Sequence, residues 1–281
     1  KNGTVSHGVF WEQHCIAFKN DFMYIVLNSG NSYYRDYLLS CLCSNVTPVS
    51  KEEYASQMHF TELNSKGEFV VNIIGDTYPG EYYSERRTKR GRWDPLVNEG
   101  YDYSFSGLKD YLRQSNLNII NLEAALVNDL SSSRLWDLKK FVLGGDPEKT
   151  IRTLINNHIH GVLLANNHLG DYEADGVLST ISCLKSAGLF FTGAGMDFNS
   201  ALKPLRFTIN GRKLIIFNAY WFRTANYRYF DFYPGVNKYG VNVLDNHLMK
   251  FIRYEKEMNP DCIVIVSPHW GVDFQQTSFL Q

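Results

Sequence analysis

Residues 161–171 read Gly-Val-Leu-Leu-Ala-Asn-Asn-His-Leu-Gly-Asp, an apolar run followed by amides, an imidazole and a carboxylate. The apolar run is typical of a short buried strand, and the polar residues stand where that strand ends. In α/β folds with parallel sheets, ligands bind beyond the carboxyl ends of the strands. The residues that follow the other strands of this chain are therefore the first candidates for a functional site.

Apolar runs alternate with helical patterns from about Glu68 onward. The expected strands cover residues 69–74, 117–122, 161–165, 188–192, 205–209, 213–218 and 262–266. The expected helices cover residues 103–114, 146–158, 173–187 and 243–258. Asn210-Gly211, between two of the strands, predicts a hairpin. This order predicts an α/β fold with a largely parallel sheet covered by helices.

Residues 1–65 differ from the rest, because they contain short apolar runs and a polar stretch but no cluster of candidate catalytic residues. We expect them to form a small N-terminal extension or the tail of an upstream domain, and residues 66–281 to form the main domain. The 28 basic and 29 acidic residues give a net charge of −1, so no global field attracts the chain to nucleic acid. No window reaches the roughly 18 unbroken apolar residues of a membrane helix, so no membrane segment is expected within this chain.

Polar side chains follow four of the expected strands. They are Asp76 after the first, Glu123 after the second, Asn166, Asn167, His168 and Asp171 after the third, and His269 after the last. Each has an ordinary reading on its own: Gly75-Asp76 as a turn, Glu123 as a partner of a helix dipole, the asparagines as turn formers, or His269 as a core histidine. Their shared position at strand ends favours a common site.

Oxygen and nitrogen donors of this kind suit a divalent metal ion such as Mn, Zn, Fe or Mg. Such an ion lowers the pKa of a bound water and braces a phosphoryl oxygen. A neighbouring imidazole such as that of His168 could act as a general acid toward a leaving group.

Several motifs of the chain occur in the same order in a known family. They are Ile74-Gly75-Asp76, Asn121-Leu122-Glu123, Ala165-Asn166-Asn167-His168 with Asp171, Gly193-Ala194-Gly195, and Ser267-Pro268-His269-Trp270-Gly271. From about Val70 to Gln281, the chain resembles the CapA-like proteins of bacterial capsule and poly-γ-glutamate synthesis, relatives of the calcineurin-like metallophosphatases. The resemblance implies an αββα sandwich of two sheets flanked by helices.

The resemblance also implies roles for individual residues. Asp76, Glu123, Asn167 and His269 would be metal ligands, His168 the catalytic imidazole, and Asp171 a support for that imidazole or its loop. Asn166 is expected to be structural.

The chain departs from the pattern of these families at three points. Metallophosphatases usually carry a histidine two residues after the first aspartate, where this chain has Tyr78, a loss that the CapA-like family shares. The usual glutamate after His-Trp-Gly is Asp273. The chain also ends before a Gly-His-His-Pro-His-type motif that supplies further ligands in the family, so we expect a domain that is incomplete at its C-terminus.

Two flanking segments carry candidate anion contacts. Arg86 and Arg87 belong to a basic run that follows the first strand, and Arg223 and Arg228 lie in the aromatic-rich segment 220–239. Their guanidinium groups suit an anionic polymer or a phosphoester. The basic run could equally be a solvated loop, and the aromatic segment could equally serve packing or an interface.

Three functions remain open from the sequence. The first is a metal-dependent hydrolase or transferase-like component that acts in the synthesis or release of an anionic polymer such as poly-γ-glutamate. The second is a non-catalytic, polymer-binding or scaffolding subunit that works with other polymer-synthase subunits. The third is a general metal-dependent phosphodiesterase. Tyr78 favours the second, whereas His168 and His269 favour the first, and the resemblance suggests association with the cell envelope.

Overall fold

The parallel sheet expected from the sequence forms one layer of the structure, a computed structural model that describes residues 37–41, 44, 46, 48–222 and 232–271. Its strands are β2 (Val71–Thr77), β3 (Leu117–Leu122), β6 (Gly161–Leu163) and β7 (Phe190–Thr192), paired in that order and all parallel. Every residue of β3 is buried, as expected for a strand covered on both faces, and its two asparagines, Asn118 and Asn121, are buried with the aliphatic residues. The bounds of β3 are those that the sequence predicted.

A second, mixed sheet is built around the long strand β10 (Arg212–Trp221). Its neighbours are β9 (Leu205–Ile209), antiparallel, and β12 (Val243–Leu244) and β13 (Ile263–His269), both parallel; β1 (Thr61–Leu63) pairs with β9. The β9–β10 hairpin turns at Asn210 and Gly211, whose φ angles of 48° and 81° fit the predicted tight turn.

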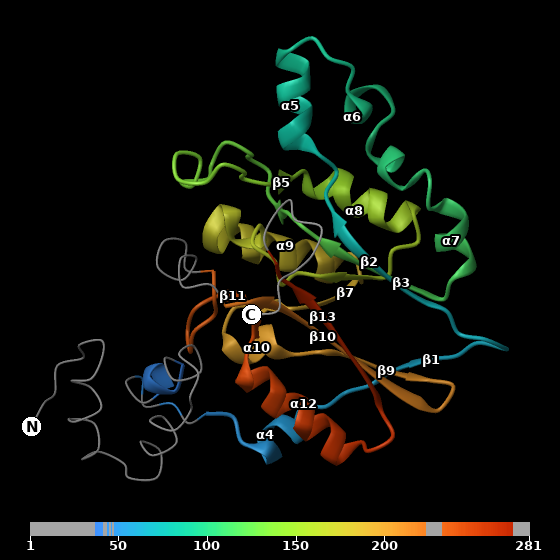
Figure 1. Cartoon of the computed structure of the whole chain (residues 1–281), viewed down its shortest axis with the longest axis vertical. Coiled ribbons are helices and arrows are strands. Elements are labelled where there is room, and N and C mark those ends of the chain that lie inside the picture. Colours follow the sequence, from blue (N-terminus) through green and yellow to red (C-terminus); the bar gives the residue numbers. More distant parts are fainter. Residues whose placement is uncertain (1–36, 42–43, 45, 47, 223–231, 272–281) are drawn as a thin grey trace, which may run out of the picture.

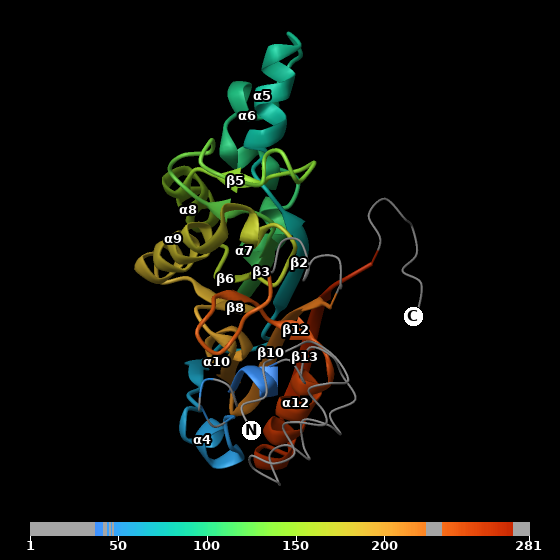
Figure 2. The ribbon, with the colours of Figure 1, turned by 90° about the vertical axis from the view of Figure 1, so that its left-hand side faces the viewer.

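The two sheets pack face to face. Leu117, Ile119 and Leu163 of the first sheet share an apolar cluster with Phe207 and Ile216 of the second. The α-helices α8 (Pro147–Asn156) and α9 (Glu173–Ser186) lie beside the first sheet, and α12 (Asn246–Met258) and α4 (Lys51–Ser56) lie beside the second (Figures 1 and 2). The arrangement confirms the expected α/β sandwich.

Smaller elements complete the chain. They are α5 (Glu81–Lys89), α6 (Pro95–Asn98), the 3-10 helix η1 (Tyr101–Phe105), α7 (Lys109–Gln114), β4 (Ala125–Leu126), β5 (Gly144–Gly145), the 3-10 helix η2 (Leu169–Tyr172), β8 (Ala194–Gly195), α10 (Phe198–Leu202) and β11 (Gly240–Val241). None of the helices in the described ranges has the length and apolar character needed to cross a bilayer.

Several elements differ from the sequence prediction. The strands β2 and β13 extend to Thr77 and His269, so Asp76 and His269 lie within them and do not follow them. The expected helix 103–114 is split into η1 and α7, with Gly107 in the turn between them. The helix expected from residue 243 begins at Asn246, where the Asp245 carboxylate caps it, because Val243 and Leu244 pair with β10 instead. The first part of the basic run is helical: Arg86, Arg87 and Lys89 lie in the last turn of α5, where the helix dipole stabilises positive charge.

Residues that precede Ser65 contact the second sheet and its helix. β1 pairs with β9, and the Tyr54 hydroxyl of α4 donates to the buried carboxylate of Glu255 at 2.7 Å. The guanidinium of Arg206 on β9 donates to the same carboxylate at 2.7 Å. These contacts anchor α4 on the sandwich, and the division of the chain at residue 65 stays a prediction.

Candidate metal centre

Three strands from the two sheets end at one point. Asp76 lies near the end of β2, after a register shift between Ile74 and Asp76. Glu123 directly follows β3, and its backbone N–H donates to the Thr77 carbonyl at 3.0 Å, which ties the first two strand ends together. His269 is the last residue of β13, in the second sheet. The two sheets therefore bring two carboxylates and an imidazole to their shared edge.

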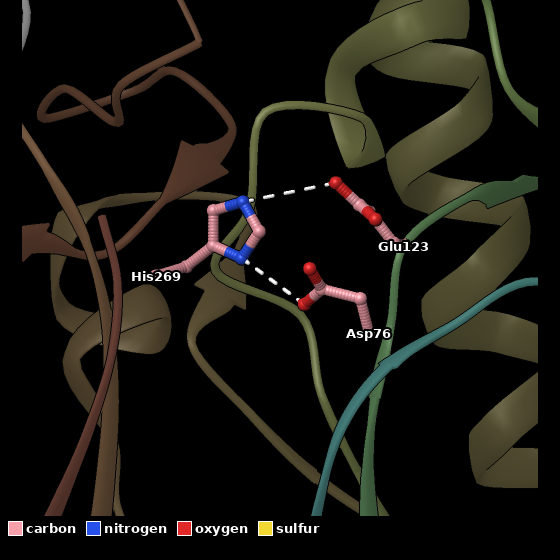
Figure 3. Close-up of side chains that lie close together, drawn as sticks. All are labelled: Asp76, Glu123 and His269. Atoms are coloured by element: carbon pink, nitrogen blue, oxygen red, sulfur yellow. Dashed lines mark ion pairs between the residues drawn. The ribbon is translucent and has the colours of Figure 1, made fainter. Parts of the chain in front are cut away.

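Asp76, Glu123 and His269, which we call the metal triad, offer ligand atoms that all lie within 4.8 Å of one another. The imidazole of His269 faces both carboxylates, one with each ring nitrogen (Figure 3): Nδ1 lies 3.4 Å from Asp76 Oδ1 and Nε2 3.7 Å from Glu123 Oε1. The Asp76 side chain is 58% exposed, whereas those of Glu123 and His269 are 20% and 18% exposed. Two carboxylates and an imidazole fit a divalent cation that can be reached from solvent.

Two amides adjoin the metal triad. The Asn167 Oδ1 atom, a predicted ligand, lies 2.8 Å from His269 Nε2. Asn121 Nδ2 donates to Asp76 Oδ1 at 2.6 Å and lies 3.3 Å from His269 Nδ1. The hydrogen bond from His269, followed by that from Asn121, holds the pKa of Asp76 below its usual value against the opposing effect of burial.

Asn121 is a residue of the site that was not predicted from the sequence. It stands two residues before Glu123, and side chains two apart along an extended strand share a side. Strand alternation could therefore have identified it.

His168 and Asp171, which we call the His–Asp pair, lie directly behind the metal triad. His168 Nδ1 lies 2.6 Å from Asp171 Oδ2, and the backbone N–H of Leu143 donates to the same oxygen at 2.6 Å. The other imidazole nitrogen, Nε2, lies 3.8 Å from Glu123 Oε1. Burial lowers the pKa of His168 below 6.5, despite the opposing hydrogen bond to Asp171, so the imidazole is neutral near neutral pH.

Asn166 has the contacts of a structural residue. Its Oδ1 accepts hydrogen bonds from the backbone N–H groups of His168 and Leu169, at 3.0 and 3.1 Å. Its Nδ2 donates to the Leu122 carbonyl at 2.9 Å. The side chain thus fixes the turn that carries His168 against the end of β3.

The predicted substrate-binding arginines are engaged in contacts around α5. The Arg86 guanidinium lies 3.4 Å from the centre of the Tyr82 ring and donates to the Tyr82 carbonyl at 3.2 Å. Arg87 Nη1 lies 3.8 Å from Asp94 Oδ2. Arg223 and Arg228 lie outside the described residues. A substrate-binding role for the four arginines stays a prediction.

Tyr78, at the position where metallophosphatases carry a ligand histidine, takes part in packing. Its hydroxyl donates to the Gly144 carbonyl at 3.0 Å and accepts from the Tyr82 backbone N–H at 2.7 Å. It lines a cavity of about 560 Å³ together with Arg86, Trp136 and Tyr172.

Comparison with known proteins identifies the family of the chain. Residues 70–278 match the family described as "Bacterial capsule synthesis protein PGA_cap". The chain is 26% identical over 239 residues to the capsule biosynthesis protein CapA of Bacillus anthracis, a match that covers 84% of this chain and 54% of that protein. The chain therefore spans about half the length of this relative. The match over most of the chain shows that it belongs to the bacterial capsule synthesis protein family.

Proposed function

We propose that the chain carries a metal-dependent hydrolase site that acts on an anionic polymer or a phosphoester during capsule synthesis. The observation that carries the proposal is the convergence of Asp76, Glu123 and His269 within 4.8 Å, with the His–Asp pair directly behind them. The relative from Bacillus anthracis is a capsule biosynthesis protein by name, and this supports the choice of process. Such a role would place the protein at the cell envelope, and poly-γ-glutamate is the polymer that the family resemblance favours.

The metal triad would bind a cation, and His168 would transfer a proton. Asp76, Glu123 and His269, with Asn167 beside them, would hold a divalent cation such as Mn, Zn, Fe or Mg. When bound, such an ion supplies a water of lowered pKa and charge stabilisation at a phosphoryl oxygen. His168 keeps Nδ1 on Asp171 and presents Nε2 to the site, which is the orientation for exchanging a proton with a leaving group or water.

Hydrolysis of bis-para-nitrophenyl phosphate with added Mn²⁺ tests this proposal. We expect activity in the unmodified chain, its loss in Asp76→Ala and His269→Ala together with metal binding, and its loss in His168→Ala with metal binding retained. Activity that survives in His168→Ala would reject the role of that imidazole. Folding of each variant is checked by circular dichroism.

A second candidate is a polymer-binding or scaffolding subunit of a synthase complex. The Tyr78 hydroxyl is bound to Gly144 and Tyr82, so this position packs α5 and offers no ligand to a second metal ion. Retention of polymer by the chain, without turnover of any phosphodiester in the presence of metal, would favour this candidate over the hydrolase. Turnover of simple phosphodiesters without polymer binding would instead favour a general phosphodiesterase.

A further inference from the structure

Three residues of the segment from Ser133 to Leu143 bind Asp171. The Ser133 hydroxyl donates to the Asp171 carbonyl at 2.5 Å, and the Leu143 backbone N–H donates to Oδ2 at 2.6 Å. The Lys139 ammonium binds the remaining oxygen, Oδ1. The Asp171 side chain is fully buried and that of Lys139 is 13% exposed, so the ion pair is largely removed from water.

Lys139 also contacts the other end of the same turn. Its ammonium donates to the Asn167 carbonyl at 2.6 Å and lies 3.3 Å from His168 Nδ1. The buried ring of Phe232 covers it, with 5.1 Å between the Lys139 Nζ atom and the ring centre. The Lys139 ammonium therefore links Asn167 to Asp171. His168 lies between these two residues in the turn.

We propose that Lys139 is a positioning residue of the site: it fixes the turn 167–171 so that His168 and Asn167 face the metal triad. The proposal rests on the proposed function for its effect on turnover, but the geometry it describes exists without any ligand.

An ammonium group has three donors, and here two of them are given to the two ends of one turn. If the Lys139 ammonium is removed, Asp171 loses the cation that balances its buried charge, and the Asn167 carbonyl loses this hydrogen-bond donor. Both changes act on groups that touch the metal triad: Asn167 through its 2.8 Å contact with His269, and His168 through its 3.8 Å approach to Glu123.

Lys139→Met tests the proposal against Lys140→Met as its matched control. Lys140 is the next residue and is exposed, and its ammonium lies over the Phe141 ring, with 5.1 Å between Nζ and the ring centre. With saturating Mn²⁺ and bis-para-nitrophenyl phosphate, we expect kcat of Lys139→Met to fall about 10–100-fold, the usual effect of removing a residue that orients the groups around a metal. KM is expected to change little, Lys140→Met to match the unmodified chain, and Lys139→Arg, which keeps the charge, to recover part of the loss.

Nitrogen-15 NMR of the imidazoles gives a readout that does not depend on activity. The hydrogen-bonded Nδ1–H of His168, assigned by its loss in His168→Gln, is expected to shift in Lys139→Met and to stay unchanged in Lys140→Met. If no protein hydrolyses the phosphodiester while this shift is seen, the proposed function fails and the positioning role stands.

A kcat and an imidazole signal of Lys139→Met that both match those of the unmodified chain would overturn the positioning role. A purely structural lysine would lower the thermal midpoint and leave kcat per folded molecule unchanged, which also overturns it. Should Lys139→Met not fold, Lys139→Gln, which keeps a donor but not the charge, decides the question by the same two readouts.

Discussion

The His–Asp pair and the metal triad lie side by side but are held in different ways. His168 and Asp171 are joined at 2.6 Å, and Asp171 is fully buried among donors from Lys139 and Leu143. Within the metal triad, the contacts from His269 to the two carboxylates are 3.4 and 3.7 Å long, and Asp76 is 58% exposed.

This difference matches the two tasks, metal binding and proton transfer, that the proposed function assigns to the site. The His–Asp pair is held by short contacts within the fold, because Lys139, Leu143 and His168 all bind the Asp171 carboxylate. The donor atoms of the metal triad lie farther apart, within 4.8 Å of one another, a spacing that suits a shared cation. The predictions below test this division, starting with the effect expected to be largest.

Asp171→Ala should destabilise the fold far more than Asp76→Ala. Removing Asp171 leaves the enclosed ammonium of Lys139 without its partner, and breaking a buried ion pair in this way costs about 3–5 kcal/mol. Asp76→Ala changes an exposed side chain that accepts a hydrogen bond from Asn121, and should lower the free energy of unfolding by about 0.5–1.5 kcal/mol. Urea unfolding in the presence of a chelator measures both, and equal losses would show that the two halves are not held differently.

A divalent cation should stabilise the chain through the metal triad. At a free Mn²⁺ concentration of about 100 times the Kd, binding to the folded state alone adds about 2.7 kcal/mol to the free energy of unfolding. The gain should vanish in Asp76→Ala and His269→Ala and persist in Asp175→Ala, which removes an exposed carboxylate of α9. Thermal unfolding with and without Mn²⁺ measures the gain, and a similar gain in all four proteins would place the cation elsewhere.

Acid should weaken the fold through His168. Burial lowers the pKa of this imidazole below 6.5, so below that pH the unfolded chain binds a proton that the folded chain does not, and the free energy of unfolding falls. His168→Gln removes this contribution and should lose less stability between about pH 7.5 and about pH 5.5. His59→Gln, at an exposed histidine, should behave as the unmodified chain does. Urea unfolding at the two pH values is the measurement, and equal losses in all three proteins would refute the effect.

Sequence patterns identified the strands and the meeting of their ends. The β3 strand has the predicted bounds because its four branched aliphatic residues need a buried strand, although Asn118 and Asn121 are buried with them. Asp76 and Glu123 could be proposed as neighbours because the carboxyl ends of adjacent parallel strands share an edge of their sheet. His269 ends a strand of the second sheet, and this rule alone does not place it beside them.

Other parts of the site could not be predicted in this way. Lys139 lies between elements, in a segment with no repeating pattern, and its partner Asp171 lies 32 residues farther along the chain. Helix α5 also escaped prediction, because its sequence is mostly polar and charged and lacks an apolar stripe. Contacts of these kinds depend on packing between distant segments, which no local pattern records.

The central claim is that the shared edge of the two sheets is a metal centre. Isothermal titration of Mn²⁺ into the metal-free chain, and into His269→Ala and His59→Ala, tests it most directly. We predict binding at a single site in the unmodified chain and in His59→Ala, and its loss in His269→Ala. Binding of equal affinity in all three proteins, or none in the unmodified chain, would contradict the claim.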